Sequence, residues 1–162
     1  MTELEFSDFY ARTARPLKSY LARITGSQTL AEDLLQESYY RILRASPNAP
    51  DESHRKNYLY RIATNLARDH FRQKRFQAAP LGEHASPVNL DARMEAANAV
   101  RKALGEIKPN ERELAWLAYV EGASHREIAA ITGLKEASVR PLLFRVRQKL
   151  ARLLRPDAGG AQ

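Results

Sequence analysis

The residue types that most often carry enzyme chemistry are sparse and poorly placed in this sequence. There is no Cys, and the four histidines, His54, His70, His84 and His125, lie too far apart for the usual metal-ligand spacings. Glycine-rich phosphate loops and nucleophile elbows are also missing. The acids Glu32 and Asp33 are too ordinary a pair to indicate an acid and a base. The sequence therefore predicts a protein that is not an enzyme and that needs no metal or cofactor.

The last third of the sequence has residues that are suited to binding nucleic acid. Between Arg140 and Arg155 there are six basic residues and no acid. In a helix, Val139, Leu143, Val146 and Leu150 form one buried seam, and Arg140, Phe144 and Arg147 lie on the next face. Guanidinium groups match guanine edges or phosphates, and an aromatic ring packs against thymine methyls. The alternative is that Phe144 belongs to the core and the arginines are merely solvated.

A second basic segment lies between His54 and Phe76, with seven basic residues and one acid. Aromatic side chains among cations suit bases that have left a stack. Tyr60 and Phe71 can equally be core residues, which makes Tyr58 the stronger candidate. On a helix, the residues predicted to face outward are Tyr58, Arg61, Asn65, Arg68 and Arg72.

An acidic stripe is expected on the second predicted helix, which precedes the basic segment that starts at His54. Asp33, Gln36, Glu37 and Tyr40 recur at helical spacing opposite an apolar face. Because carboxylates repel DNA, these residues indicate either a surface for a protein partner or plain solvation.

The charge balance agrees with two separate contacts on a polyanion. The chain has 162 residues, a net charge of +7 and a pI of about 9.9, and its two basic segments carry more than this whole excess. The absence of Cys suits a reducing compartment, so a cytoplasmic location is expected. Apolar runs are too short to insert in a membrane.

Helical periodicity and the lack of strand-like alternation predict an all-α protein of two small domains. The first domain is expected over residues 1–76, with its first helix interrupted or bent near Pro16 and its third starting at about Arg55. A flexible linker is expected over 77–91 and a disordered tail over 157–162. The second domain, over 92–156, contains a helix-turn-helix. Its short first helix opens with a capping box at Ser124, and its long second helix starts at about Glu136.

Three segments in this order resemble bacterial RNA polymerase sigma factors of the extracytoplasmic-function (ECF) group. They are AEDLLQESYYRILR (31–44), NYLYRIATNLARDHFRQKR (57–75) and SHREIAAITGLKEASVRPLLFRVRQKL (124–150). The resemblance implies a promoter-specificity factor that binds core RNA polymerase through the β′ clamp helices and the β flap, binds promoter DNA, and is controlled by an anti-sigma factor.

The resemblance also implies roles for individual residues. Residues 1–76 match sigma region two and residues 92–156 match region four. Polymerase binding falls on Asp33, Gln36 and Glu37. Reading of the minus-ten promoter element falls on Tyr58, Arg61, Asn65 and Arg68, together with the loop before them. Contact with the minus-thirty-five element falls on Arg140, Phe144, Arg145 and Arg147.

The sequence departs from the family pattern at three places, one of which is the loop before Tyr58, which lacks the Phe-Gly character often seen. Tyr58 stands where a Trp is common, which keeps a stacking face. Pro141 and Leu142 replace a usual Ser/Thr-Arg pair in the recognition helix, so a kink and a lost phosphate contact are expected.

Two other functions fit the same residues. A stand-alone helix-turn-helix regulator would bind a palindromic site as a dimer without polymerase. A sigma-like mimic would sequester an anti-sigma factor and would not bind DNA.

Overall fold

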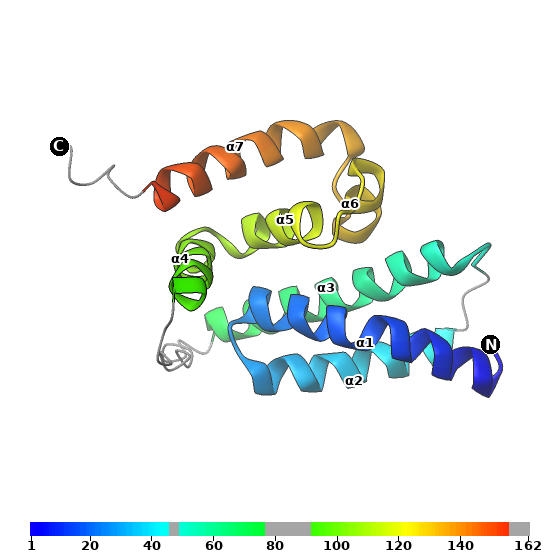
Figure 1. Cartoon of the computed structure of the whole chain (residues 1–162). Coiled ribbons are helices and arrows are strands. Elements are labelled where there is room, and N and C mark those ends of the chain that lie inside the picture. Colours follow the sequence, from blue (N-terminus) through cyan, green and yellow to red (C-terminus); the bar gives the residue numbers. More distant parts are fainter. Residues whose placement is uncertain (46–48, 77–91, 156–162) are drawn as a thin grey trace.

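The computed structural model describes residues 1–45, 49–76 and 92–155. Over these ranges it contains helices and turns but no strand, which confirms the predicted all-α class (Figure 1). The expected linker and tail fall outside the described residues. The helices are α1 (Glu3–Thr25), α2 (Gln28–Ala45), α3 (Glu52–Phe76), α4 (Ala92–Glu106), α5 (Pro109–Tyr119), α6 (His125–Thr132) and α7 (Glu136–Leu154).

Helices α1, α2 and α3 pack on one another as an N-terminal bundle. Helix α1 begins with a capping box, in which the Thr2 hydroxyl accepts from the Glu5 backbone N–H and the Glu5 carboxylate accepts from the Thr2 N–H. It ends at Gly26, whose φ of 76° suits glycine. The core side chains of the bundle include Phe9, Leu17, Tyr20, Leu21, Ile42, Leu59 and Tyr60.

The expected interruption of the first helix is wrong, because α1 is continuous through Pro16. A proline within a helix removes one backbone donor and favours a kink. Here the residues on both sides of Pro16, Thr13 and Leu17, are buried against the other helices. Tertiary packing of this face compensates for the lost hydrogen bond.

Helix α3 begins three residues earlier than the sequence indicated, at Glu52 rather than at about Arg55. Asp51 explains the difference, because its carboxylate accepts a hydrogen bond of 2.9 Å from the backbone N–H of His54. A side chain that satisfies one of the first free N–H groups fixes the start of a helix.

Helices α4 to α7 form a C-terminal bundle that contains the predicted helix-turn-helix. The capping box at Ser124 is confirmed: its hydroxyl accepts from Glu127 N at 3.1 Å, and Glu127 accepts from Ser124 N at 2.9 Å. Gly133, with φ of 82°, ends α6 and opens the turn into α7. This turn sets the angle at which α7 leaves α6.

The two bundles lie against each other, with α6 on α3 and α5 on α1 (Figure 1). Their buried apolar side chains form one continuous cluster, which includes Tyr60 from α3 and Leu117 from α5. The sequence predicted two domains but gave no indication of this interface.

Candidate nucleic-acid interface

Helix α7 presents a basic face to solvent at the edge of the C-terminal bundle. Its buried seam is confirmed for Val139, Leu143 and Val146, whereas Leu150 is half-buried. Phe144 is 52% exposed, which rules out the alternative that it fills the core. The three candidate arginines beside it are also exposed: Arg140, Arg145 and Arg147. The face thus presents three guanidinium groups and one aromatic ring to solvent.

Pro141 and Leu142 do not break α7. The helix runs without interruption from Glu136 to Leu154, with Pro141 well past its first turn. Leu142 is half-buried and packs against the core of the bundle. An apolar side chain in that position stabilises the bundle.

The four minus-ten candidates on α3 have two different settings. Tyr58 is 42% exposed and Asn65 is also exposed. Arg61 and Arg68 instead bind the C-terminal bundle across the interface. The Arg61 guanidinium, although exposed, donates to the backbone carbonyl of Ala130 at 3.1 Å. The expectation that Arg68 faces solvent is wrong, because the side chain lies half-buried between the bundles.

The half-buried Arg68 forms an ion pair with the buried Glu113 of α5. Its Nη2 donates to Glu113 Oε1 at 2.7 Å, its Nε to Oε2 at 3.4 Å, and its Nη1 to the carbonyl of Thr132 at 2.8 Å. Glu113 is only 3% exposed. Burial raises the pKa of the Glu113 carboxyl above its ordinary value, although Arg68 acts in the opposite direction.

A second polar contact crosses the interface at Glu121. The Tyr60 hydroxyl donates to Glu121 Oε2 at 3.0 Å, and Lys56 Nζ lies 3.6 Å from Oε1. Burial is the main reason why the pKa of Tyr60 is raised, and the Glu121 carboxylate adds to the effect. Tyr60 is therefore a core and interface residue, which decides one alternative that the sequence left open.

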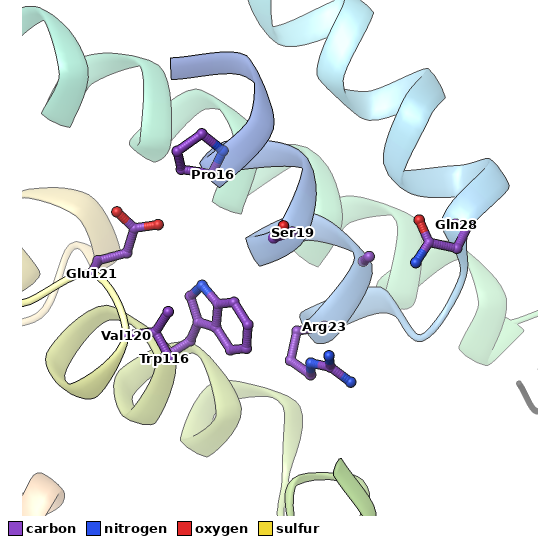
Figure 2. A pocket seen from close by; sticks show the side chains of 8 residues that line it. Pro16, Ser19, Arg23, Gln28, Trp116, Val120 and Glu121 are labelled. Atoms are coloured by element: carbon purple, nitrogen blue, oxygen red, sulfur yellow. The ribbon is translucent and has the colours of Figure 1, made fainter. Parts of the chain in front are cut away.

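A pocket of about 400 Å³ lies where α5 meets α1 and the start of α2 (Figure 2). Trp116, Val120 and Glu121 line one side, and Pro16, Ser19, Arg23 and Gln28 line the other. The Arg23 guanidinium carbon lies 5.4 Å from the centre of the Trp116 ring, a cation–π contact between the bundles. Burial lowers the pKa of Arg23 below its ordinary value.

The acidic stripe on α2 lies on the outer surface of the N-terminal bundle. Asp33 and Gln36 are exposed, and Glu37 is half-buried and forms an ion pair of 2.9 Å with Arg41. Tyr40 is 55% exposed. This leaves a mixed polar and aromatic surface that faces away from the helices of the bundle.

Sequence reasoning missed Arg23, Glu113 and Trp116 as interface residues. The signal at Glu113 was weak: one acid at the edge of the apolar run 114–120. Trp116, the single Trp, lies within that run and was assigned no role. None of the three can be assigned to an interface without knowing which helix lies opposite.

Two further findings concern the part of the chain that the structure describes. It contains no group of three or more His, Asp or Glu side chains that could hold a metal ion. None of its helices is long and apolar enough to cross a membrane.

Comparison with known proteins identifies both halves of the chain. Residues 9–77 match the family model of sigma-70 region 2, and residues 97–150 match that of sigma-70 region 4. The RNA polymerase sigma factor CarQ of Myxococcus xanthus is 32% identical over 154 residues, covering 92% of this chain and 88% of CarQ. The ECF RNA polymerase sigma factor SigE of Mycolicibacterium smegmatis is 34% identical over 79% of this chain, and the match spans only 53% of SigE.

Solved structures share the fold. The sigma factor RpoE of Bartonella quintana, in complex with the anti-sigma factor NepR, matches with a TM-score of 0.75 and 22% identity, covering 94% of this chain and 98% of RpoE. CnrH, in complex with the cytosolic domain of CnrY, matches with a TM-score of 0.70 and 26% identity, covering 94% of this chain and 89% of CnrH. With its two matched regions and its identity to CarQ, the chain belongs to the RNA polymerase sigma factors of the ECF group.

Proposed function

We propose that this sigma factor binds core RNA polymerase, directs it to promoters by reading two DNA elements, and helps to open the duplex. It catalyses no bond formation itself and acts in the cytoplasm with the polymerase. The observation that carries the proposal is the exposed cationic face of α7 within a chain that belongs to the sigma factors.

The minus-thirty-five contact is assigned to α7. Arg140, Arg145 and Arg147 offer guanidinium groups to base edges and phosphates, and Phe144 offers a ring between them. A helix that follows a helix-turn-helix turn is the usual reader of a major groove. The exposure of these four side chains supports the assignment.

The minus-ten contact is assigned to α3 of the N-terminal bundle. Tyr58 is exposed and can stack on a base that has left the duplex. Asn65, Arg61 and Arg68 lie along the same stripe of the helix, where an amide and two cations can meet bases and phosphates. Arg61 is exposed although it donates to the Ala130 carbonyl, whereas Arg68 is half-buried and becomes fully available only when α6 moves away from α3.

Core polymerase is assigned to the exposed side of α2, through Asp33, Gln36 and Glu37, with a further contact from the region-four half to the β flap. An acidic surface is kept off DNA by repulsion and is free for a protein. We also propose an anti-sigma factor as a regulator, since RpoE of Bartonella quintana was solved in complex with the anti-sigma factor NepR.

Run-off transcription with purified core polymerase tests this function. Core polymerase is mixed with the protein and genomic DNA fragments, and the new transcripts are sequenced, which gives activity and promoter sequence together. Transcripts that start only when the protein is present are expected. A protein that neither pulls down core polymerase nor changes its start sites contradicts the proposal.

The same materials separate the alternatives. A stand-alone regulator binds a palindromic site as a dimer without polymerase. A sigma mimic binds an anti-sigma factor and no DNA, even with polymerase present. A sigma factor requires polymerase for tight promoter binding.

A further inference from the structure

We propose that the pocket between α1 and α5 binds a small aromatic carboxylate, whose negative end meets the Arg23 guanidinium and whose ring lies against Trp116 and Val120. The pocket has a volume of about 400 Å³, which lies in the usual range for small-molecule sites. None of the residues that line it belongs to the surfaces assigned above to DNA or to core polymerase. The pocket is therefore a further binding site, separate from those surfaces.

Arg23 places a positive charge in this pocket without a counter-ion. Within the described ranges no carboxylate pairs with its guanidinium, and its Nε is buried without a hydrogen-bond partner. Burial lowers the pKa of Arg23, and the positive charge of Arg101 on α4 lowers it further. Because a half-buried charge is costly unless it is paired, an anion bound beside Arg23 supplies the missing partner.

The acid on the opposite wall does not take that role, because it is already engaged. The Glu121 carboxylate accepts a hydrogen bond of 3.0 Å from the Tyr60 hydroxyl through Oε2, and Lys56 Nζ lies 3.6 Å from Oε1. In Figure 2 the Trp116 ring lies between Glu121 and Arg23. The two ends of the pocket thus differ in charge, and the Arg23 end is the one that attracts an anion.

Trp116 adds a second donor that lacks a partner. Its indole N–H is buried and makes no hydrogen bond within the described part of the chain. Figure 2 shows the nitrogen on the edge of the ring that is turned toward α1 and Ser19. Buried polar groups without a partner are rare in folded proteins. Since the unpaired groups of Arg23 and Trp116 are both donors, the ligand that satisfies them carries acceptors, which a carboxylate has and an ammonium group lacks.

The rest of the pocket selects an apolar body rather than a bare anion. Pro16 of α1 and Val120 at the C-terminal end of α5 line it together with the Trp116 ring, and Val120 is 58% exposed. A ring laid on these side chains removes apolar surface from water. Phosphate fits less well, because a single guanidinium lines the pocket and Glu121 adds a negative charge to it.

Isothermal titration calorimetry on the free chain tests the site with two probes, phenylacetate and 1-naphthaleneacetate. At least one of them is expected to bind with a Kd below about 1 mM. Three reference compounds separate the contributions. The compound 1-naphthaleneacetamide keeps the ring without the charge, acetate keeps the charge without the ring, and inorganic phosphate offers a different anion. Each is expected to bind about tenfold more weakly or worse.

Trp116 locates the bound probe, because it is the single Trp of the chain and its ring lines the pocket. Phenylacetate is expected to shift the emission of Trp116, and the shift should saturate over the concentrations at which calorimetry detects binding. Heat of binding without a change in Trp116 emission places the probe elsewhere and overturns the assignment.

Arg23→Gln tests the charge at the site while keeping a polar side chain. The affinity for the probe is expected to fall about tenfold or more, because the ligand carboxylate loses its counter-charge. The matched control is Arg15→Gln, since Arg15 is an exposed arginine on the same helix, about two turns before Arg23. This control should bind the probe as the starting protein does.

A second pair of variants leaves Arg23 in place, because Arg23 also contacts Trp116 across the two bundles and its substitution deletes that contact. Val120→Glu adds a negative charge beside the site and should weaken probe binding about tenfold or more. Val120→Gln has the same size as that variant without its charge and should keep most of the affinity. Both variants should retain their helicity in circular dichroism, because Val120 is exposed.

The carboxylate site is ruled out if neither acid binds with a Kd below about 1 mM, or if the naphthalene amide binds as tightly as the acid. Equal affinities for Arg23→Gln and Arg15→Gln also rule it out, as do equal affinities for Val120→Glu and Val120→Gln. Calorimetry uses neither polymerase nor DNA. A failure in run-off transcription therefore contradicts the proposed function and leaves the binding result unaffected.

Discussion

At the residue scale, Arg147 is the simplest test of the DNA-facing side of α7. It is exposed, and it lies one turn from Phe144 on the same face. Arg147→Ala is expected to weaken binding of the holoenzyme to promoter DNA by about 1–3 kcal/mol, because a guanidinium contact to a base or phosphate is lost. Fluorescence anisotropy at fixed salt measures the change.

Arg15→Ala is the matched control for Arg147. Arg15 is an exposed arginine on α1, far along the chain from α7, so the variant removes the same charge. Equal affinity for the two variants and the starting protein removes Arg147 from the DNA-binding set.

The acidic stripe on α2 is tested by Asp33→Ala combined with Glu37→Ala. The pair is expected to weaken association with core polymerase about tenfold or more, on the order of 1.4 kcal/mol. Helicity should not change, because the ion pair between Glu37 and Arg41 is largely exposed and contributes little to stability.

Glu32→Ala provides the control, since Glu32 is exposed on the same helix and pairs with Lys18 of α1 at 2.9 Å. Surface plasmon resonance with immobilised core polymerase compares the variants. A fall in helicity for the double variant points to a structural role instead.

At the element scale, the start of α3 depends on a charged cap. The backbone N–H and the ring of His54 bind the Asp51 carboxylate and hold its pKa below its usual value of 3.8. Because the pKa of Asp51 is lower in the folded protein, its carboxylate stabilises the fold fully at pH values above the ordinary pKa of an Asp. This stabilisation is lost as the pH falls through the lowered pKa of the folded protein. The melting temperature should therefore decline over that range in part because of Asp51.

Asp51→Asn isolates this contribution, because Asn also caps helices but does not titrate. We expect equal melting temperatures for the two proteins near pH 7 and a difference that changes between about pH 5 and pH 3. Thermal unfolding followed by circular dichroism measures it. A difference that is constant with pH contradicts the assignment.

Helix α7 contains Pro141 beyond its first turn and is nevertheless continuous. Pro141→Ala restores a backbone donor and should stabilise the C-terminal half by up to about 3 kcal/mol. Pro109→Ala is the control, because Pro109 is the first residue of α5. A backbone N–H at that position makes no hydrogen bond within the helix, so restoring it should add little stability. Urea unfolding compares the two, and equal gains would contradict the argument.

At the scale of the whole molecule, Trp116 reports on the interface between the bundles. It is the only Trp, it lies half-buried in the pocket, and Arg23 of α1 covers its ring. Acrylamide should quench its fluorescence more in Arg68→Ala, which leaves Glu113 buried without a counter-charge, than in the control Arg72→Ala, because separation exposes the ring to solvent. Equal quenching in both variants means that the bundles remain together.

The electrostatic hypothesis from the sequence requires two basic faces that are open to solvent, and the two segments differ in this respect. The face of α7 is open, as that hypothesis requires. On α3, Arg68 pairs with Glu113 and Arg61 binds Ala130, so only part of the segment faces solvent.

The sequence by itself determined most of the helices, the cap at Ser124 and the faces that α7 buries and exposes. These depend on neighbours three or four residues apart, as the Ser124 capping box and the seam from Val139 to Val146 illustrate. The order of the three segments also identified the family.

Only the tertiary structure decided that the two bundles pack together and that Arg68 faces Glu113. These residues are 45 positions apart, and an arginine on a polar stripe looks the same in the sequence whether water or a carboxylate lies opposite. The continuity of α1 through Pro16 was decided in the same way, by burial against helices that local periodicity cannot place. Contacts between distant segments depend on how whole helices are arranged, which no short-range pattern encodes.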